Sequence, residues 1–554
     1  MNEFIKKLKE AGFTGEVDNS NEVLDFYSHD ASLFEIRPKL IVFPTDNKDV
    51  EILTSLVARE KKNIKGLSLT ARSAGTDMSG AAINDSIIVD FTKHFTNIGE
   101  IRNSSAKTQP GVYYRDFDVE TRKRGYLLPT FPASRDLCTV GGMVNNNSGG
   151  EKSIEFGKTD LFINSLRFVF SDGVSREVKP LKKVDLDKKM AQNDFEGEVY
   201  TKLFNLINNN YDLIKSAKPN VSKDSTGYHL WDVWDKKTQI FDITKAIVGA
   251  QGTLGLVTDI DFKLTKARPE SGVLVIFMNN IDNLGGLIEK VVEHNPSRFE
   301  SFDDQTLMLS LRFMPKFYKM LGLRKFIRLI FSLIPDALQL TRGIPRQILL
   351  ISFKGNTDKE IFKKIQQLHA ELDTEKKQYG ISGFEVLATD EDAQKFWIMR
   401  RYSFKILRDN VKDKHTAPFI DDLVVNPQHL SKFLPEIRKI IKKYRLFATI
   451  SGHMGDGNFH IIPLMRLDEP SERAKLEPAM REVNNLVLKY KGSLSGEHND
   501  GLVRGPWLEQ MYGQEVVELF RQTKDIFDPQ GIFNPHKKAN ATWEYSFNHV
   551  RDHF

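Results

Sequence analysis

The chain has 554 residues, 40% of them hydrophobic and 28% charged, and at this length we expect two or more domains. Lysine and arginine number 79 against 74 aspartate and glutamate residues, a balance that argues against a protein built mainly to bind nucleic acid. The single cysteine, Cys138, excludes an intrachain disulfide and a multi-cysteine iron–sulfur site.

The first residues, MNEFIKKLKEAGF, form a charged amphipathic pattern without the apolar run of a signal peptide. No uninterrupted apolar stretch has the length needed to span a bilayer. The sequence therefore predicts a cytoplasmic protein.

From about residue 35, short β-rich runs alternate with turn signals and helical patterns. Asp46 is placed to cap a helix through NKDVEILTSLVAREKK. Near residues 266–269 the pattern changes, and the apolar runs SGVLVIFMN and QILLISFKG each precede a long helical pattern. This predicts a second α+β domain with an antiparallel sheet. Strands are predicted in the first part at KLIVFP, LSLTA and SIIVDF, and the mixed pattern continues through INSLRFVFSDG and AIVGAQGTLGLVTDIDFKL.

Residues 317–334, FYKMLGLRKFIRLIFSLI, interleave basic and large apolar side chains. At helical spacing this pattern makes a basic amphipathic surface suited to an anionic bilayer. A helix packed on its own domain explains the pattern equally well. Peripheral contact with the inner face of a membrane therefore stays open.

Two glycine-rich loops in the first half have the chemistry of phosphate binding. Residues 71–82, ARSAGTDMSGAA, are small enough for backbone N–H groups to surround an anion. In residues 132–150, PASRDLCTVGGMVNNNSGG, two glycine pairs bracket an asparagine run. Neither loop is a Walker motif or a strict G-x-G-x-x-G. One such loop is usually a tight turn, but two favour a bound dinucleotide.

These loops, followed by YHLWD and VGAQGTLGLVTDI, resemble the FAD-binding domain of the vanillyl-alcohol-oxidase/PCMH flavoprotein superfamily. FDPQGIFNPHK resembles the C-terminal segment that contacts the flavin in that family, and the likeness covers roughly residues 25–540. The resemblance implies an α+β fold, with a two-subdomain PCMH-type FAD-binding domain and a substrate (cap) domain whose antiparallel sheet is flanked by helices. The expected parts are an N-terminal helical segment 1–34, the FAD-binding domain 35–268, the substrate domain 269–520 with its basic insertion 317–334, and a segment 521–554 that returns to the flavin.

The resemblance also implies which residues hold FAD. Attachment is expected to be non-covalent, because the first loop has no histidine, and Cys138 is expected to be a buried apolar residue. The implied flavin contacts are Arg72, Ser73, Ala74, Gly75, Thr76, Gly80, Pro132, Ser134, Thr139, Gly142, Asn146, Gly252, Thr253, Gly255, Val257 and Asn534.

The stretch GHMGDGNFH places His453 and His460 on either side of a glycine-rich turn, and GEHN later supplies Glu497 and His498. If the turn closes a hairpin, the two histidines converge from its arms. Two imidazoles and one carboxylate suit Zn²⁺, Mn²⁺ or Fe²⁺ and leave coordination positions open for substrate. An isolated histidine pair is usually structural, but the nearby Glu-His and the flavin loops favour a metal held by His453, His460 and Glu497.

These motifs resemble the D-2-hydroxy-acid branch of the superfamily, which includes D-lactate, glycolate and D-2-hydroxyglutarate dehydrogenases. SGEHNDGLVRGPWLEQMYG is especially like the larger bacterial FAD-linked oxidases, some of which have a C-terminal iron–sulfur domain. This chain stops before such a domain, so electrons are expected to pass to an external acceptor: a quinone, an electron-transfer flavoprotein or a separate iron–sulfur protein. The family commonly has glycine after Glu-His, where this chain has Asn499.

The implied reaction oxidises the substrate at the metal, with His498 taking the hydroxyl proton and flavin N5 receiving hydride. Consecutive strand side chains face opposite ways, so Glu497 and His498 can act together only on irregular backbone. The resemblance places a carboxylate-binding arginine at Arg400 in W-x-x-R, although a basic surface helix face explains Arg400 or Arg401 equally well. Asn458 is expected to add a substrate hydrogen bond. Asp421 and Asp422 are expected to support the site, and Lys223 to be solvated.

The leading hypothesis is FAD-dependent oxidation of a D-2-hydroxy acid to the 2-oxo acid. One rival is an oxidase of the same fold that acts on another alcohol and reduces O₂. Another is a flavin-binding electron-transfer or membrane-docking subunit without a substrate of its own. The sequence leaves a homodimer open and identifies neither the metal nor the substrate's side chain.

Overall fold

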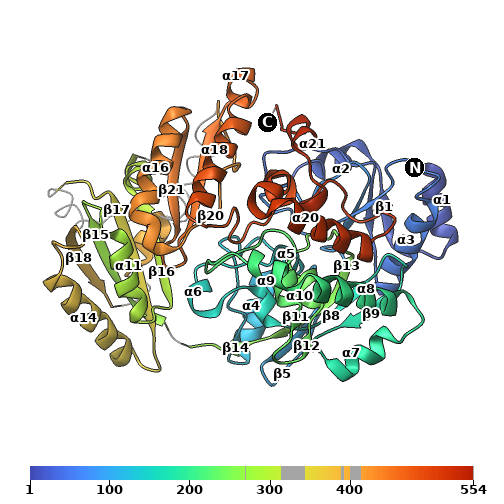
Figure 1. The fold of residues 1–554 in the computed structure, drawn as a ribbon, viewed down its shortest axis with the longest axis horizontal. Coiled ribbons are helices and arrows are strands. Elements are labelled where there is room, and N and C mark those ends of the chain that lie inside the picture. The colour runs from blue at the N-terminus through green and yellow to red at the C-terminus, as the bar shows by residue number, and fades with distance from the viewer. Residues whose placement is uncertain (269, 313–342, 389–391, 400–412, 553–554) are drawn as a thin grey trace.

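The structure is a computed structural model that describes residues 1–268, 270–312, 343–388, 392–399 and 413–552. Arg400 and the basic segment 317–334 lie outside the described residues. Figure 1 shows the first half of the chain on one side of the molecule, the substrate domain on the other, and the C-terminal helices α20 and α21 over the first half. No helix among the described residues is both long and apolar enough to cross a bilayer.

The two central strands of the first sheet of the FAD-binding domain are short apolar runs whose side chains are buried on both faces. Within the described residues its order is β1-β2-β4-β3, with β2, β4 and β3 parallel and β1 antiparallel to β2. Helix α3 (Asn47–Glu60) follows β2 and begins as predicted, because the Asp46 carboxylate accepts the Asp49 N–H at 2.9 Å. The strands are β1 (Glu16–Asp18), β2 (Leu40–Phe43), β3 (Leu69–Arg72) and β4 (Ile87–Asp90).

A second, antiparallel sheet forms the other half of this domain, in the order β5-β6-β13-β8-β9. Its apolar side chains share a core with the long C-terminal helix α20 (Leu508–Phe527). The strands are β5 (Ile98–Arg102), β6 (Ser105–Thr108), β8 (Ile163–Val169), β9 (Ser175–Val178) and β13 (Leu256–Lys263). The principal helices of this half are α4 (Tyr114–Lys123), α5 (Val140–Asn146), α7 (Lys183–Met190), α8 (Phe195–Asn209) and α9 (Tyr211–Ala217).

The end of the chain returns to the first sheet. The Leu69 N–H donates to Ile532 O at 2.7 Å, and the Asn534 N–H donates to Leu69 O at 2.8 Å. These bonds extend the edge at β3, so the C-terminal residues lie beside the first glycine-rich loop, which follows that strand.

The substrate domain contains an antiparallel sheet of eight strands within the described residues, in the order β18-β15-β17-β16-β21-β22-β19, with β20 paired to β22. One face of this sheet packs on helices α11, α14, α16 and α18. The strands are β15 (Glu270–Met278), β16 (Arg298–Asp303), β17 (Gln347–Lys354), β18 (Ile381–Leu387), β19 (His415–Thr416), β20 (Leu423–Val424), β21 (Phe447–His453) and β22 (Asn458–Met465). The helices are α11 (Leu284–Glu293), α12 (Asp304–Arg312), α14 (Asp358–Thr374), α16 (Leu430–Lys443) and α18 (Leu476–Lys489).

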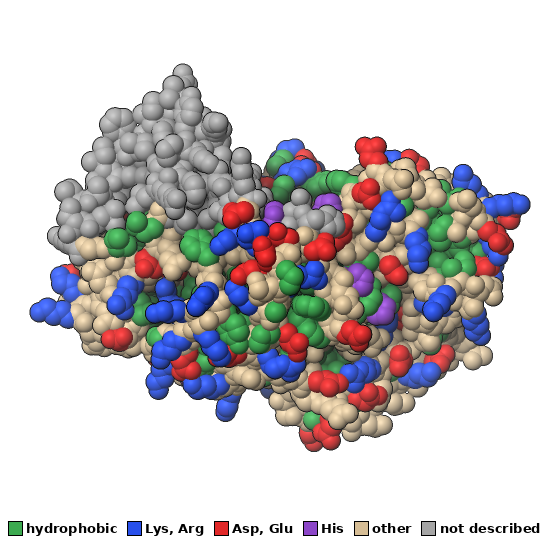
Figure 2. Space-filling model, turned by 90° about the horizontal axis from the view of Figure 1, so that it is seen from above, with side chains coloured by type: hydrophobic (Ala, Val, Ile, Leu, Met, Phe, Trp, Pro, Cys, Tyr) green, Lys and Arg blue, Asp and Glu red, His purple; other side chains and the backbone are tan. Residues whose placement is uncertain are grey.

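This arrangement confirms the predicted α+β fold with an antiparallel sheet in the second domain. On the face shown in Figure 2, basic and acidic side chains are interspersed. That mixture agrees with the near balance of charges in the sequence.

Candidate active site

One cavity joins the two glycine-rich loops to the histidine hairpin. Its walls come from the FAD-binding domain on one side and from β21, β22 and the turn of residues 495–500 on the other. Most of the predicted flavin contacts line it: Ser73, Ala74, Gly75, Thr76, Pro132, Ser134, Thr139, Gly142, Asn146, Gly252 and Val257.

The other predicted flavin contacts are not among the residues that line this cavity: Arg72, Gly80, Thr253, Gly255 and Asn534. Arg72 supports the first loop. Its Nη1 donates to Tyr27 O at 3.3 Å, and its Nη2 packs so closely on Gly75 that a Cβ there would be only 2.6 Å away. Asn534 ties loops together by donating to Ala81 O at 2.9 Å and Gln251 O at 2.7 Å.

The second loop is shaped by glycines and a helix cap. Thr139 caps α5 by accepting the Gly142 N–H at 3.2 Å. A Cβ on Gly141 would lie 2.4 Å from Pro110 Cβ, so no larger residue fits there without a shift. Asn146 donates to Asp77 Oδ1 at 2.9 Å and thereby joins the second loop to the first. Contacts within the protein therefore hold the two loops together without a ligand.

Cys138 also lines this cavity and is almost fully buried. Burial raises the pKa of its thiol to about 12, so the thiol stays protonated at neutral pH. The prediction of a buried apolar cysteine is confirmed.

The predicted hairpin is formed by β21 and β22, which pair from Phe447–Leu464 to His453–Asn458. Gly457 makes the turn possible, because its φ is +64° and a Cβ there would lie 1.9 Å from Val425 O. The rings of His453 and His460 lie 5.4 Å apart. The two histidines therefore converge as predicted.

The histidine nitrogens point at one carboxylate oxygen. Oε1 of Glu497 lies 3.2 Å from His453 Nε2 and 3.4 Å from His460 Nε2. The opposite nitrogens face other buried carboxylates, with His453 Nδ1 2.7 Å from Glu300 Oε1 and His460 Nδ1 3.3 Å from Asp421 Oδ1. Carboxylates behind the imidazoles are the usual environment of metal-binding histidines. The donor set therefore fits a divalent metal.

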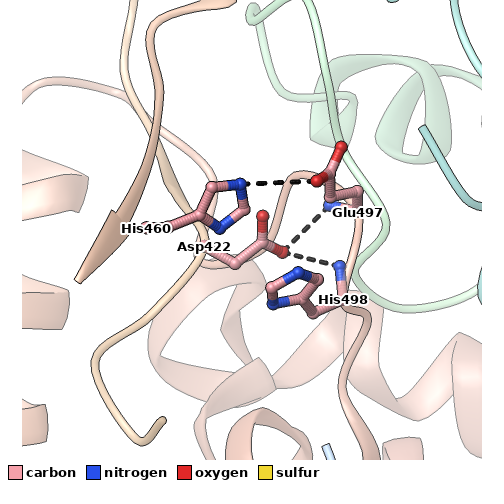
Figure 3. A group of neighbouring side chains, drawn as sticks. All are labelled: Asp422, His460, Glu497 and His498. Atoms are coloured by element: carbon pink, nitrogen blue, oxygen red, sulfur yellow. Dashed lines mark hydrogen bonds and ion pairs between the residues drawn. The ribbon is translucent and has the colours of Figure 1, made fainter. Parts of the chain in front are cut away.

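Asp422 lies close enough to be considered as a further ligand. Ligand atoms of Asp422, His460, Glu497 and His498 all lie within 4.8 Å of one another (Figure 3). Asp422 Oδ2, however, accepts the N–H groups of Glu497 at 2.9 Å and His498 at 2.7 Å, and its Oδ1 accepts Asn458 Nδ2 at 3.0 Å. Because both oxygens are engaged, we assign Asp422 to shaping the turn. His453 is not among these four residues, and it reaches them through Glu497 Oε1, 3.2 Å from its Nε2. The set of His453, His460 and Glu497 stays a prediction.

The turn of residues 495–500 has no regular secondary structure, and both Glu497 and His498 line the cavity. The prediction of irregular backbone is confirmed. Nδ1 of His498 lies 2.8 Å from Asp421 Oδ2, and its ring stacks on His460 at 5.0 Å. Nε2 is then the nitrogen of His498 that can exchange a proton with a molecule in the cavity.

The carboxylates give the site a strong preference for positive charge. Burial alone would raise the pKa of Glu497, but Lys223 and His453 outweigh it and hold that pKa well below its usual range. Burial likewise opposes protonation of His460, but its contacts with Asp421 and Glu497 raise its pKa to about 10. Without a metal, His460 is therefore protonated at neutral pH and provides the positive charge beside Glu497.

Lys223 corrects one expectation. It was predicted to be solvated, but its side chain is fully buried. Its Nζ lies 3.1 Å from Glu497 Oε2 and 3.3 Å from Asp456 Oδ2, and so connects the FAD-binding domain to the substrate domain. Burial is unfavourable for this ammonium, but the two carboxylates outweigh burial and raise its pKa.

Other residues of the site were not predicted. Thr306, Thr449, Ser451 and Ile462 line the cavity beside the histidines, at positions that no sequence motif marked. Glu300 had one available signal, since it is one of two acids in the buried strand RFESFD. Asn458, the predicted substrate contact, is directed to Asp422 and to Leu423 O at 3.3 Å.

Matches to two protein families together cover most of the chain. Residues 38–179 match the family described as "FAD binding domain", and residues 268–538 match "FAD linked oxidases, C-terminal domain". The chain belongs to the FAD-linked oxidases. This confirms the family resemblance seen in the motifs and assigns FAD as the cofactor of the first loops.

Individual relatives of this FAD-linked oxidase are distant. It is 26% identical to a D-2-hydroxyglutarate dehydrogenase of Pantoea ananatis over 96% of this chain and 51% of that protein. It is 23% identical to the "Glycolate oxidase subunit GlcD" of Bacillus subtilis, over 94% of this chain and 93% of that protein. It is also 23% identical to a D-lactate dehydrogenase of Anaerostipes hadrus, over 97% of each protein. The chain spans about half the length of the first of these relatives.

Solved structures share the fold of this FAD-linked oxidase. An alkyldihydroxyacetonephosphate synthase superposes with a TM-score of 0.66 at 17% identity, covering 97% of this chain and 86% of that one. A 4-ethylphenol oxidase from Gulosibacter chungangensis gives 0.65 at 13% identity, covering 98% of each chain. At these identities the likeness shows the fold alone.

Proposed function

We propose that this protein is an FAD-dependent dehydrogenase that oxidises a D-2-hydroxy acid to the 2-oxo acid with the help of a divalent metal. The main support is that one and the same cavity is lined by both glycine-rich loops and by the cluster of His453, His460, Glu497 and His498. The names of the relatives, which act on D-2-hydroxyglutarate, glycolate and D-lactate, support the substrate class.

The two bound groups would supply hydride acceptance by FAD and Lewis acidity by the metal. His453, His460 and Glu497 would hold the metal, and the small residues of the two loops would hold FAD. His498 accepts the hydroxyl proton at Nε2, while the C–H hydrogen leaves with its electron pair as the carbonyl forms. Asp421 stabilises the resulting imidazolium through Nδ1, 2.8 Å away.

Anaerobic flavin reduction tests this proposal. The holoprotein is mixed with D- and L-2-hydroxy acids, and bleaching of the flavin absorbance is followed. We expect bleaching by a D-acid, loss of bleaching after chelator treatment, and loss in His498→Ala with FAD still bound. Normal bleaching in His498→Ala would reject the role of His498, and no bleaching by any hydroxy acid would reject the substrate class.

Two rivals are separated by further measurements. An oxidase would form one peroxide per substrate in air, whereas a dehydrogenase would reduce dyes faster than O₂. A docking subunit without a substrate would show liposome binding but no flavin reduction. The external electron acceptor, the homodimer, the cytoplasmic location and the membrane contact of segment 317–334 stay predictions.

A further inference from the structure

Asn499 follows directly after the candidate ligand and base and occupies a strained position. It is fully buried, and its φ of +67° lies in the left-handed region, which asparagine tolerates better than most residues. Its N–H donates to Ser495 Oγ at 2.8 Å and closes the turn that presents Glu497 and His498.

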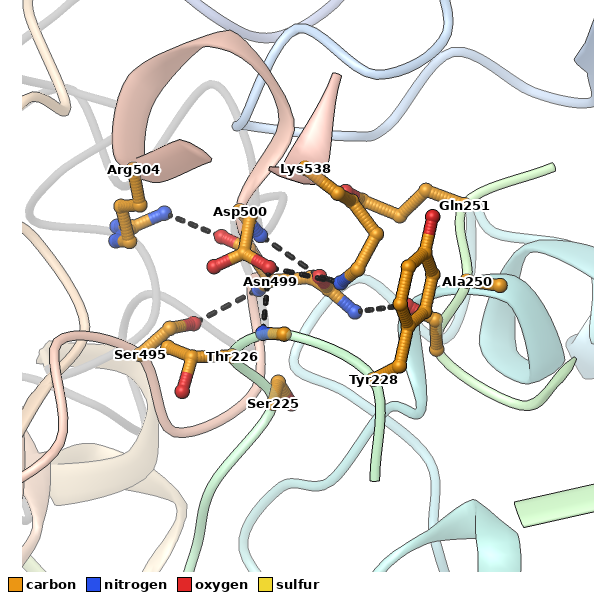
Figure 4. Close-up of polar contacts among 12 residues, drawn as sticks. Ser225, Thr226, Tyr228, Ala250, Gln251, Ser495, Asn499, Asp500, Arg504 and Lys538 are labelled. Carbon is orange, nitrogen blue, oxygen red and sulfur yellow. Dashed lines mark hydrogen bonds and ion pairs between the residues drawn. The ribbon is translucent and has the colours of Figure 1, made fainter. Parts of the chain in front are cut away.

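The side chain of Asn499 reaches the other domain. Its Nδ2 donates to Gly249 O at 2.8 Å and to Asn146 O at 3.2 Å. Figure 4 shows Asn499 close to Ser495, Asp500 and Lys538. Asn146 lines the cavity, and Gly249 lies two residues before Gln251, which lines it too. One carboxamide from the substrate domain therefore joins both flavin-side segments.

Lys538 fixes which end of that carboxamide faces the loops. Its Nζ donates to Asn499 Oδ1 at 2.5 Å and pairs with Asp500 Oδ2 at 2.8 Å. An ammonium only donates hydrogen bonds, so Oδ1 must face Lys538 and Nδ2 must face the two carbonyls. Lys538 is itself fully buried and belongs to the C-terminal segment, which also contains Asn534.

A second contact is made by a side chain of the FAD-binding domain, Gln251. Gln251 Oε1 accepts the Gly501 N–H at 2.8 Å, and its Nε2 donates to Ser79 Oγ at 2.9 Å and Asn146 Oδ1 at 3.2 Å. The turn and the flavin loops are thus connected from both sides. A shift of the turn would move the loops, and a shift of the loops would move the turn.

We propose that Asn499 is a positioning residue that holds the Glu497–His498 turn in register with the flavin loops, with Lys538 orienting its carboxamide. Two consequences follow. Loss of the carboxamide loosens FAD, and it also slows hydride transfer, which depends on sub-ångström placement of the reacting groups. The second consequence rests on the proposed function, whereas the first does not.

Two substitutions separate the backbone of Asn499 from its side chain. Asn499→Gly keeps the left-handed conformation and removes all side-chain hydrogen bonds of Asn499, including those to Gly249 O and Asn146 O, so the dissociation constant for FAD should rise about tenfold. Asn499→Asp keeps the contact with Lys538 but turns an acceptor toward two carbonyls, so its FAD dissociation constant should rise further. Reconstitution of apoprotein, followed by flavin fluorescence, measures both values.

Asn295 provides a matched control, since it is a left-handed asparagine (φ +52°) on the surface of the substrate domain. Asn295→Gly should leave FAD affinity unchanged. Wild-type FAD affinity in both Asn499 variants would overturn the proposal, and so would an equal loss in Asn295→Gly. If FAD loosens as expected but no hydroxy acid reduces the wild-type flavin, the positioning role stands and the proposed substrate class fails.

Where wild-type turnover exists, the flavin reduction rate at saturating substrate gives a second reading. In Asn499→Gly, loaded with excess FAD, this rate should fall at least tenfold while the substrate concentration for half-saturation changes little. An unchanged rate would overturn the positioning role in catalysis.

Discussion

Glu300 and His453 form a buried pair, with Glu300 Oε1 2.7 Å from His453 Nδ1. The two residues face each other across neighbouring strands, since β16 pairs with β21 with Glu300 opposite His453. A carboxylate at Nδ1 keeps the proton there and leaves Nε2 as the metal-binding atom. The orientation of the candidate ligand is therefore set by the sheet.

Replacing Glu300 by Gln should weaken metal binding without removing a ligand. Loss of the carboxylate behind a metal-binding histidine usually costs about 10–100-fold in metal affinity. Competition with a chromophoric chelator measures the dissociation constant. Glu289→Gln, a change at an exposed position of α11, should leave it unchanged. Equal metal affinity in Glu300→Gln and wild type would contradict the assignment of His453 as a ligand.

Metal binding should strengthen as the pH rises. Asp421 and Glu497 raise the pKa of His460 to about 10 in the protein alone, so His460 is protonated at neutral pH. A metal must displace that proton, and each pH unit below this pKa therefore costs up to tenfold in affinity. Calorimetry at pH 6, 7 and 8, in buffers of different ionisation enthalpy, should show proton release on binding. Metal affinity that is constant across this range would exclude His460 as a ligand.

The sequence predicted the parts of the site that local patterns encode. The Gly-Asp-Gly turn marked the hairpin that brings His453 and His460 together, and the small residues of the two loops marked the cavity. The partners from distant strands were not predictable, because their positions depend on sheet register. Glu300 meets His453 only because β16 lies beside β21. In the sequence nothing distinguishes Lys223 from a solvated lysine, because its partners Asp456 and Glu497 belong to the other domain.

Gly457 offers a test of the hairpin that separates backbone strain from steric conflict. Its φ is +64°, and a Cβ would lie 1.9 Å from Val425 O. Gly531 has nearly the same φ, +63°, but nothing lies within 4 Å of its Cβ position. Both alanine variants should lose about 1–2 kcal/mol to left-handed backbone strain. The free energy of unfolding of Gly457→Ala should fall clearly further, because of the conflict with Val425 O, and its metal affinity should fall as well.

Thermal unfolding and metal content measure this difference. Gly531→Ala is expected to bind metal like the wild type. Equal melting temperatures for the two variants would mean that the contact with Val425 does not constrain the turn.

Lys223 is the last position at which the structure makes a sharp prediction. Lys223→Met removes a buried cation from between Glu497 and Asp456, which then remain buried without it. Breaking a buried pair by removing one partner typically costs about 3–5 kcal/mol, so the melting temperature should fall by several degrees. Lys237→Met, at an exposed position of the same domain, should have little effect. Adding Asp456→Asn to Lys223→Met should restore part of the loss, because one unpaired carboxylate is then neutral. A Lys223→Met protein as stable as the wild type would show that Glu497 does not depend on this cation.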